Sequence, residues 1–149
     1  NYGLAGLRQD RIVLDEGTAA AWIGQSMVQS VQHGLASMDW FLWSGTDTND
    51  KVGIQLYTGS PVANAAWNEM RSWLIGARMQ RCGQQGTLYA CQLTSGAGQN
   101  VTIAWATSGT ASLPATGLGS IACTLGQPCA PIGAAPAITV GAMPVMIRP

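Results

Sequence analysis

The order of the predicted elements constrains this chain most, because helical patterns fill its first half and strand patterns its second. The first half predicts a helix over residues 15–34, the strand MDWFLW, an extended stretch KVGIQLYTG and a helix over residues 61–76. Asp15 suits a helix N-cap, and Pro61 suits the first position of a helix. A lone strand between two amphipathic helices has no partner for its backbone groups. We therefore expect residues 1–76 to be a wedge of a larger α/β structure that does not fold alone.

Short runs rich in β-branched residues make up the second half, separated by Gly, Pro, Ser and Thr. They are TLYACQLT, NVTIAWAT, ASLPATGLGSIACTL, AITVG and PVMIRP. Such spacing is typical of an antiparallel β-sandwich. The predicted fold class is α+β, with one unit over residues 1–77 and a small β-sandwich domain, able to fold by itself, over residues 78–149.

Charge and hydropathy exclude several classes of function. Charged residues make up 9% of the chain, seven basic and seven acidic, so the formal net charge is zero. These charges are scattered singly and form no basic stripe, so nucleic acid is not an expected partner. No apolar run approaches the roughly 20 residues of a membrane-spanning helix, so no transmembrane segment is expected. The apolar content of 47% is enough to bury a core.

The four cysteines form two close pairs along the sequence. Cys82 and Cys91 flank GQQGTLYA, and Cys123 and Cys129 flank TLGQP. Neither pair has the two-residue gap of a zinc knuckle, and His33 is the only histidine. Two disulfide-closed loops are therefore favoured over free thiols, and no metal site is expected. Disulfides indicate an oxidising compartment, hence a secreted, extracellular or cell-surface protein.

The six tryptophans divide into two groups. Four are predicted to lie in the core: Trp22, Trp67, Trp73 and Trp105. Trp40 and Trp43 are three positions apart in MDWFLW, so in a regular strand they face opposite sides. Trp40 is interpreted as a buried residue, whereas Trp43 is nearer the C-terminal end of the strand.

Five stretches taken in order resemble the C-terminal part of certain secreted bacterial glycoside hydrolases. They are NYGLAG, WFLWSGTD, GIQLYTG, SPVANAAWNEMRSWLIGA and VGAMPVMI. These enzymes belong to the retaining (β/α)₈-barrel clan, near family thirty-nine. The resemblance covers nearly the whole chain and implies the last strand and helices of a barrel followed by a β-sandwich. It also implies a carbohydrate substrate, no cofactor, and a partner in the remainder of the barrel chain, N-terminal to Asn1.

The resemblance further implies where a sugar would bind. In the related enzymes the seventh barrel strand ends in Thr-Glu-Ile/Val-Asn-Tyr-Gly, and its Glu is the nucleophile. This chain begins with Asn1, Tyr2 and Gly3, so Asn1 and Tyr2 would border the subsite. Trp43, at the end of the eighth strand, would be a stacking platform for a sugar ring. Asp47 follows in the loop on the face where barrel enzymes place their sites.

Neither catalytic carboxyl group of such an enzyme lies within this sequence. Retaining hydrolysis needs two carboxyls about 5–5.5 Å apart. The only glutamates are Glu16, at a helix start, and Glu69, within the second helix. Both are interpreted as helix-surface residues. No residue is therefore assigned a catalytic role, and the chain alone is expected to be inactive.

An alternative function of another class stays open. The chain could be a non-catalytic carbohydrate-binding or cell-surface assembly module that uses its aromatic residues for contact and its disulfides for durability. Because it starts at Asn1 with neither Met nor signal peptide, we expect it to be processed or cut from a longer chain. The residues encoded before Asn1 would discriminate between the two functions.

Overall fold

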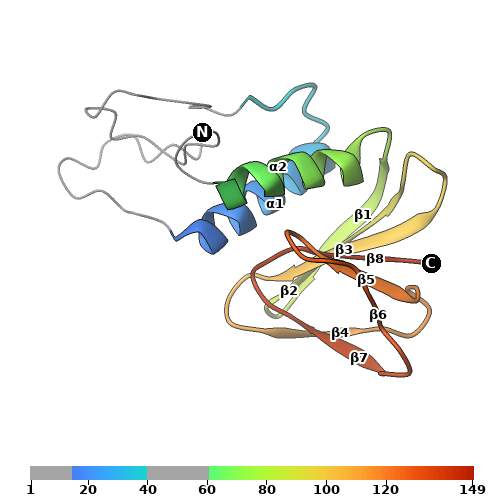
Figure 1. Cartoon of the computed structure of the whole chain (residues 1–149). Helices are drawn as coiled ribbons and strands as arrows, with labels where there is room; N and C mark the ends of the chain where they lie inside the picture. Colours follow the sequence, from blue (N-terminus) through green and yellow to red (C-terminus); the bar gives the residue numbers. More distant parts are fainter. Residues whose placement is uncertain (1–14, 40–60) are drawn as a thin grey trace.

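The computed structural model describes residues 15–39 and 61–149 (Figure 1). Two helices, α1 (Glu16–Gln32) and α2 (Pro61–Leu74), precede the strands. Within the described residues, six strands form an antiparallel sheet in the order β1-β2-β3-β8-β5-β6, and β4 pairs with β7 in a separate ribbon. The strands are β1 (Arg78–Gln85), β2 (Leu88–Thr94), β3 (Asn100–Ala106), β4 (Ala111–Pro114), β5 (Ile121–Thr124), β6 (Ala130–Pro131), β7 (Ala137–Val140) and β8 (Val145–Arg148).

Helix α1 begins at the aspartate cap that the sequence predicts. The Asp15 carboxylate accepts a 2.6 Å hydrogen bond from the Thr18 hydroxyl and a 2.9 Å bond from the Thr18 backbone N–H. These bonds stabilise the charged form, so they lower the pKa of Asp15. The helix ends at Gln32, and Gly34 just beyond it has a φ of 66°, which an L side chain rarely adopts.

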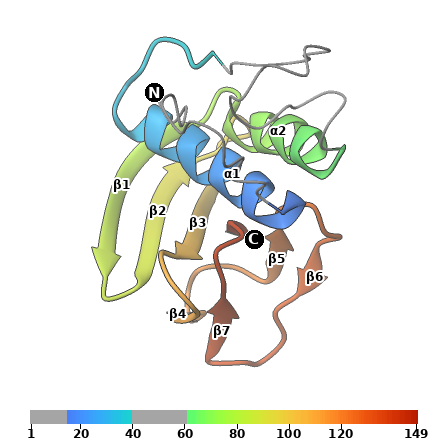
Figure 2. The ribbon, with the colours of Figure 1, turned by 90° about the vertical axis from the view of Figure 1, so that its left-hand side faces the viewer.

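Helix α2 packs beside α1 and runs in the same direction (Figures 1 and 2). The middles of the two helices meet, because a Cβ built at Gly24 would lie 3.0 Å from Met70 Cε. Their C-terminal ends also meet, since Val31 of α1 and Leu74 of α2 line one pocket. The start of α2 at Pro61 confirms the predicted boundary.

The six-stranded sheet lies between the two helices and the β4–β7 ribbon, which each cover part of one face (Figure 1). On one face, α1 and α2 share an apolar cluster with β2, β3, β8 and the end of β5; its members include Ile23, Met70, Trp73, Leu93, Ile103 and Trp105. On the other face, the β4–β7 ribbon packs through Leu113 and Val140 onto Ala104, Val145 and Ile147. The helices and the sheet therefore share one core, and a fragment of residues 78–149 alone would expose the apolar face that the helices cover.

The predicted α+β class is confirmed, and the strand runs of the second half form β2, β3, β4, β5, β7 and β8 as expected, whereas the short strand β6 lies outside them. The stretch ASLPATGLGSIACTL divides into β4 and β5. Strand β1 was not expected, because RMQRCGQQ has neither β-branched residues nor an alternation of apolar and polar residues. It lies at the sheet edge and is mostly exposed, so little apolar patterning is required of it.

The tryptophan predictions are correct in part. Trp105 and Trp73 are buried, and Trp67 is half-buried against the same core. The prediction for Trp22 is wrong, because this side chain is 41% exposed. Along α1 the core-facing positions include Ile23 and Met27, whereas Trp22 falls on the flank that carries the polar residues Thr18, Gln25 and Gln29.

The barrel assignment of residues 1–77 remains a prediction. The described part of this segment contains the two helices and the stretch that leads from α1 to Asp39. Of MDWFLW, Met38 and Asp39 belong to the described residues, whereas residues 40–43, Trp40 included, lie outside them.

Gly24 sets the closest approach of α1 to the rest of the core. A Cβ at this position would lie 2.7 Å from Leu125 Cδ2 and 2.9 Å from Pro144 Cγ, besides its contact with Met70. Leu125 and Pro144 are both fully buried, so neither can move aside into solvent. Glycine disfavours a helix interior, but at position 24 its lack of a side chain is what lets α1 pack this closely on the core.

We predict that Gly24→Ala destabilises the chain. Alanine should gain about 1 kcal/mol from helix propensity, whereas overpacking a filled core costs about 1–3 kcal/mol. The free energy of unfolding in urea should therefore fall. In a Leu125→Ala background, which removes the closest contact, the same substitution should cost much less. An equal cost in both backgrounds would contradict the packing argument.

Candidate functional site

The predicted sugar-binding residues lie outside the described part of the chain. Asn1 and Tyr2 precede Asp15, and Trp43 and Asp47 lie between Asp39 and α2. Their assignment therefore remains a prediction from the resemblance. The structure describes the helices on either side of residues 40–60, a pocket between those helices, and the contacts that join the helices to the sheet.

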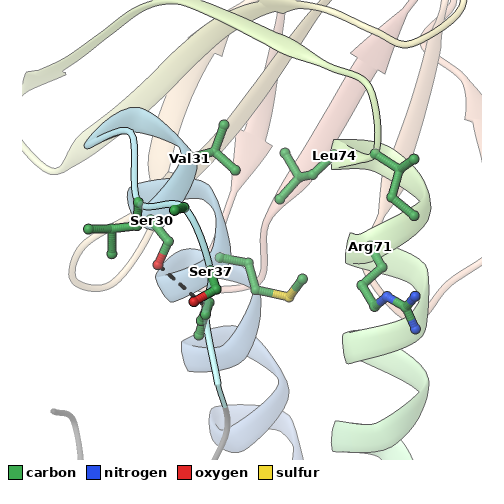
Figure 3. A pocket seen from close by; sticks show the side chains of 10 residues that line it. Ser30, Val31, Ser37, Arg71 and Leu74 are labelled. Atoms are coloured by element: carbon green, nitrogen blue, oxygen red, sulfur yellow. Dashed lines mark hydrogen bonds between the residues drawn. The ribbon is translucent and has the colours of Figure 1, made fainter.

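The pocket lies where the C-terminal ends of α1 and α2 meet (Figure 3). Its volume is about 220 Å³, and it is open to solvent on one side. It is lined by Met27, Ser30, Val31, Leu35, Ala36, Ser37, Met38, Arg71, Leu74 and Ile75. Leu35 and Ile75 are 60% and 66% exposed, so the rim is apolar.

The lining of this pocket suits contact rather than catalysis. Among the described residues, Arg71 is the one ionisable side chain of the lining, and none of the others is a carboxylate, thiol or imidazole. The Ser30 hydroxyl already donates a 2.8 Å hydrogen bond to the Ser26 carbonyl, as helical serines often do. The volume is also smaller than the roughly 300–1,000 Å³ of typical ligand pockets. The segment from Leu35 to Met38 forms one wall and leads directly to the strand expected to carry Trp43.

Glu69 has a structural partner that the sequence did not reveal. Its Oε2 accepts a 2.7 Å hydrogen bond from the backbone N–H of Gly126, 57 residues further along the chain. Gly126 lies between β5 and β6, in the loop that the Cys123–Cys129 disulfide closes. Glu69 is therefore half-buried and joins α2 to this loop, whereas Glu16 is exposed in the first turn of α1.

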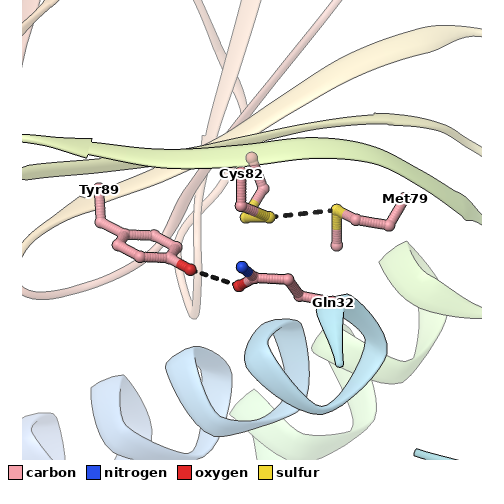
Figure 4. The surroundings of a disulfide bond; sticks show 5 residues. Gln32, Met79, Cys82 and Tyr89 are labelled. Carbon is pink, nitrogen blue, oxygen red and sulfur yellow. Dashed lines mark hydrogen bonds between the residues drawn. A yellow bond between two sulfur atoms is a disulfide. The ribbon is translucent and has the colours of Figure 1, made fainter. Parts of the chain in front are cut away.

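Both predicted disulfides are confirmed, and none of the four cysteines is free. Cys82 and Cys91 face each other directly in the β1–β2 register. Around this bond the Tyr89 hydroxyl donates to Gln32 Oε1 at the end of α1 (Figure 4). Tyr89 also stacks on Trp105, with ring centroids 4.5 Å apart. These aromatic rings therefore belong to the helix–sheet contact.

A third polar contact completes the joint between helices and sheet. Gln25 Nε2 donates a 2.7 Å hydrogen bond to the Ala142 carbonyl, in the connection between β7 and β8. With Gln32 on Tyr89 and Glu69 on Gly126, polar side chains from both helices reach the β-strand half of the chain. Such contacts cannot be predicted from a single sequence, because the hydrogen-bond partner of each side chain is a distant backbone group or tyrosine hydroxyl.

Metal and membrane sites can be addressed for residues 15–39 and 61–149. No group of three or more His, Cys, Asp or Glu side chains there could hold a metal ion. Neither of the two helices is long and apolar enough to cross a membrane. Two disulfides fit an extracellular protein, and secretion remains a prediction.

Comparison with known proteins leaves the resemblance without independent support. The chain matches no protein-family model, and no curated protein or solved structure matches it. The assignment to glycoside hydrolases therefore remains a prediction from the order of the sequence motifs.

We predict that the Glu69 contact stabilises the chain and does no chemistry. Glu69→Ala should lower the free energy of unfolding by about 1 kcal/mol, since one hydrogen bond is lost. Glu69→Gln keeps an acceptor oxygen and should change it by less. Amide hydrogen exchange at Gly126 reports the contact directly and should accelerate in Glu69→Ala only. Equal exchange rates at Gly126 in the two variants would contradict the assignment.

Proposed function

We propose that this chain is the C-terminal portion of a secreted retaining glycoside hydrolase, in which α1 and α2 are the last helices of a (β/α)₈ barrel. The observation that carries the proposal is that α1 and α2 lie side by side and run in the same direction. In a β/α repeat each helix follows one strand and precedes the next, so successive helices are parallel. Two helices joined by a short turn would be antiparallel instead.

The connection between α1 and α2 is long enough to contain the strand that a β/α repeat requires. α2 has 14 residues and is therefore about 21 Å long. The C-terminal ends of α1 and α2 lie together. The chain that follows α1 therefore has to return along the length of the pair to reach the start of α2 at Pro61. A strand of about six or seven residues covers that distance. MDWFLW has this length and is the stretch that the sequence predicts to be a strand.

In this proposal the β-strand half packs against the last two helices of the barrel and contributes no residue to the catalytic cleft. The helices bury its apolar face, and Gln25, Gln32 and Glu69 fix the two parts together. Trp43, Asn1, Tyr2 and Asp47 would contribute to the sugar cleft on the barrel side. Both catalytic carboxylates would come from the chain that precedes Asn1.

The alternative, a carbohydrate-binding β-sandwich module, finds little support on the surface of the strands. Such a module would use exposed aromatic rings as platforms for sugars. Tyr89 and Trp105, the only aromatic residues of residues 78–149, face the helices; Trp105 is 1% exposed and Tyr89 is half-buried. The strands therefore offer no aromatic platform within the part of the chain that the structure describes.

We predict opposite effects for Trp40 and Trp43 in the intact enzyme. Trp43→Ala should lower kcat/KM on an aryl β-glycoside at nearly unchanged Tm, because a ring at a strand end contributes more to sugar stacking than to packing. Trp40→Ala should cost about 3–5 kcal/mol of stability, as expected for a large core truncation. Trp22→Ala, which removes a partly exposed tryptophan of α1, is the matched control and should change kcat/KM little.

Two results would contradict this function. One is hydrolysis of aryl glycosides by the 149-residue chain alone, especially if Glu16→Gln or Glu69→Gln abolished it. The other is loss of Tm without selective loss of kcat/KM in Trp43→Ala. Binding of the isolated chain to an uncharged polysaccharide would favour the module instead.

A further inference from the structure

The charges of this chain are divided unevenly along its length. All seven acidic residues lie at or before Glu69, so residues 78–149 have no carboxylate side chain. That part of the chain does have three basic residues, Arg78, Arg81 and Arg148. Arg78 and Arg81 are both exposed, and both lie on β1, at the edge of the six-stranded sheet. This edge is therefore cationic and has no acidic side chain within its own sheet.

A β-bulge in β1 turns two consecutive side chains toward the same face. The register of β1 on β2 shifts between Met79 and Arg81 and leaves Gln80 without a partner residue. Gln80 Nε2 donates a 2.8 Å hydrogen bond to Thr94 Oγ1, and Arg81 Nε donates a 2.8 Å bond to Gln92 Oε1. Both side chains thus lie over β2 on one face. Bulges re-aim side chains in this way and are over-represented beside functional sites.

The bulge gathers a polar surface that we term the bulge face. Its six members are Arg78, Gln80, Arg81, Gln92, Thr94 and Asn100. They lie on the side of the sheet away from the helices, since the intervening Leu93 faces the helix core. Further along the same side, Leu88 and Ala90 pack toward the β4–β7 ribbon. The bulge face is thus the part of that side left exposed or half-exposed.

The chemistry of these groups selects a ligand that is both acidic and rich in hydroxyls. Arg81 uses Nε on Gln92, and its planar guanidinium has further donors that can bind a carboxylate through two parallel bonds. Gln80, Gln92 and Asn100 offer amide donors and acceptors, which match hydroxyl groups. Their mutual hydrogen bonds hold the side chains in place before a ligand arrives.

We propose that the bulge face binds an anionic polysaccharide, with Arg78 and Arg81 on its carboxylates and the amides on its hydroxyl groups. A second copy of the chain is a poorer occupant, because pairing two β1 edges would bring the arginines of both copies together. A nucleic acid strand is also poorer, because the bulge face has no aromatic ring for base stacking. The proposal uses β1 to β3 only, so it stands whether or not the barrel assignment is correct.

The test is titration of the 149-residue chain with polygalacturonate at low salt, with methyl-esterified polygalacturonate as the uncharged comparison. The Arg78→Gln, Arg81→Gln double variant should bind polygalacturonate at least about tenfold more weakly, since two charged hydrogen-bonding groups are lost. Arg71→Gln changes the same kind of charge on α2, away from this face, and should bind as the parent does. Gln80→Ala, Asn100→Ala should weaken binding at constant charge.

Three outcomes would overturn the proposal. They are no measurable binding of polygalacturonate, equal weakening by Arg71→Gln, and equally tight binding of single-stranded DNA or of the esterified polymer. Near-ultraviolet circular dichroism of Trp105 and its neighbours checks that each variant is folded. If the double variant fails to fold, the pair Gln80→Ala, Asn100→Ala decides the question, because unchanged affinity in that pair would also contradict the assignment.

Discussion

Burial of one apolar sheet face beneath two helices is the interaction on which the rest of this structure depends. Leu93, Ile103 and Trp105 point from neighbouring strands toward α1 and α2, and each is essentially excluded from solvent. Burying a large apolar side chain contributes about 1.5–3 kcal/mol, so this face cannot be left uncovered at little cost. The helices have the same requirement, because Ile23 and Met70 are also fully buried. The helices and the sheet therefore bury each other's apolar side chains.

Local constraints hold the two halves in register around this core. The Cys82–Cys91 disulfide joins opposite residues of the β1–β2 hairpin, and Cys123–Cys129 closes the loop that contains Gly126. A disulfide that closes a loop of this size stabilises the fold by about 2–3 kcal/mol, because it lowers the conformational entropy of the unfolded chain. Glu69 then binds the Gly126 amide, so the second disulfide also shapes a contact of α2. The absence of a side chain at Gly24 is what allows α1 to sit this close.

Much of this architecture is predictable from the sequence, because strong local signals agree with it. Asp15 and Pro61 fix two helix starts, the β-branched runs give the interior strands, and the cysteine spacing gives both disulfides. β1 could not be predicted, because a polar edge strand lacks the alternation of apolar and polar residues that marks a half-buried strand. The prediction for Trp22 is wrong because this residue lies one position away from the core-facing stripe that contains Ile23 and Met27.

The contacts and site residues are harder to predict from the sequence than the fold. Contacts such as that of Glu69 with Gly126 join distant residues through backbone groups, which leave no pattern in one sequence. The bulge that brings Gln80 and Arg81 to one face depends on strand register and not on composition. The roles of Trp43 and Asp47 are predictions from the resemblance, and both residues lie outside the described part of the chain.

Native-state hydrogen exchange of the 149-residue chain tests the shared core most directly. If helices and sheet form one cooperative unit, the slowest amides of α1, near Ile23, and of α2, near Met70, should exchange with the same opening free energy as that of Ile103 in β3. That free energy should equal the one measured by global unfolding in urea. The contrary result is that the helix amides open at a clearly lower free energy while the strand amides stay protected. It would show that the sheet is stable without the two helices, and it would contradict a single shared core.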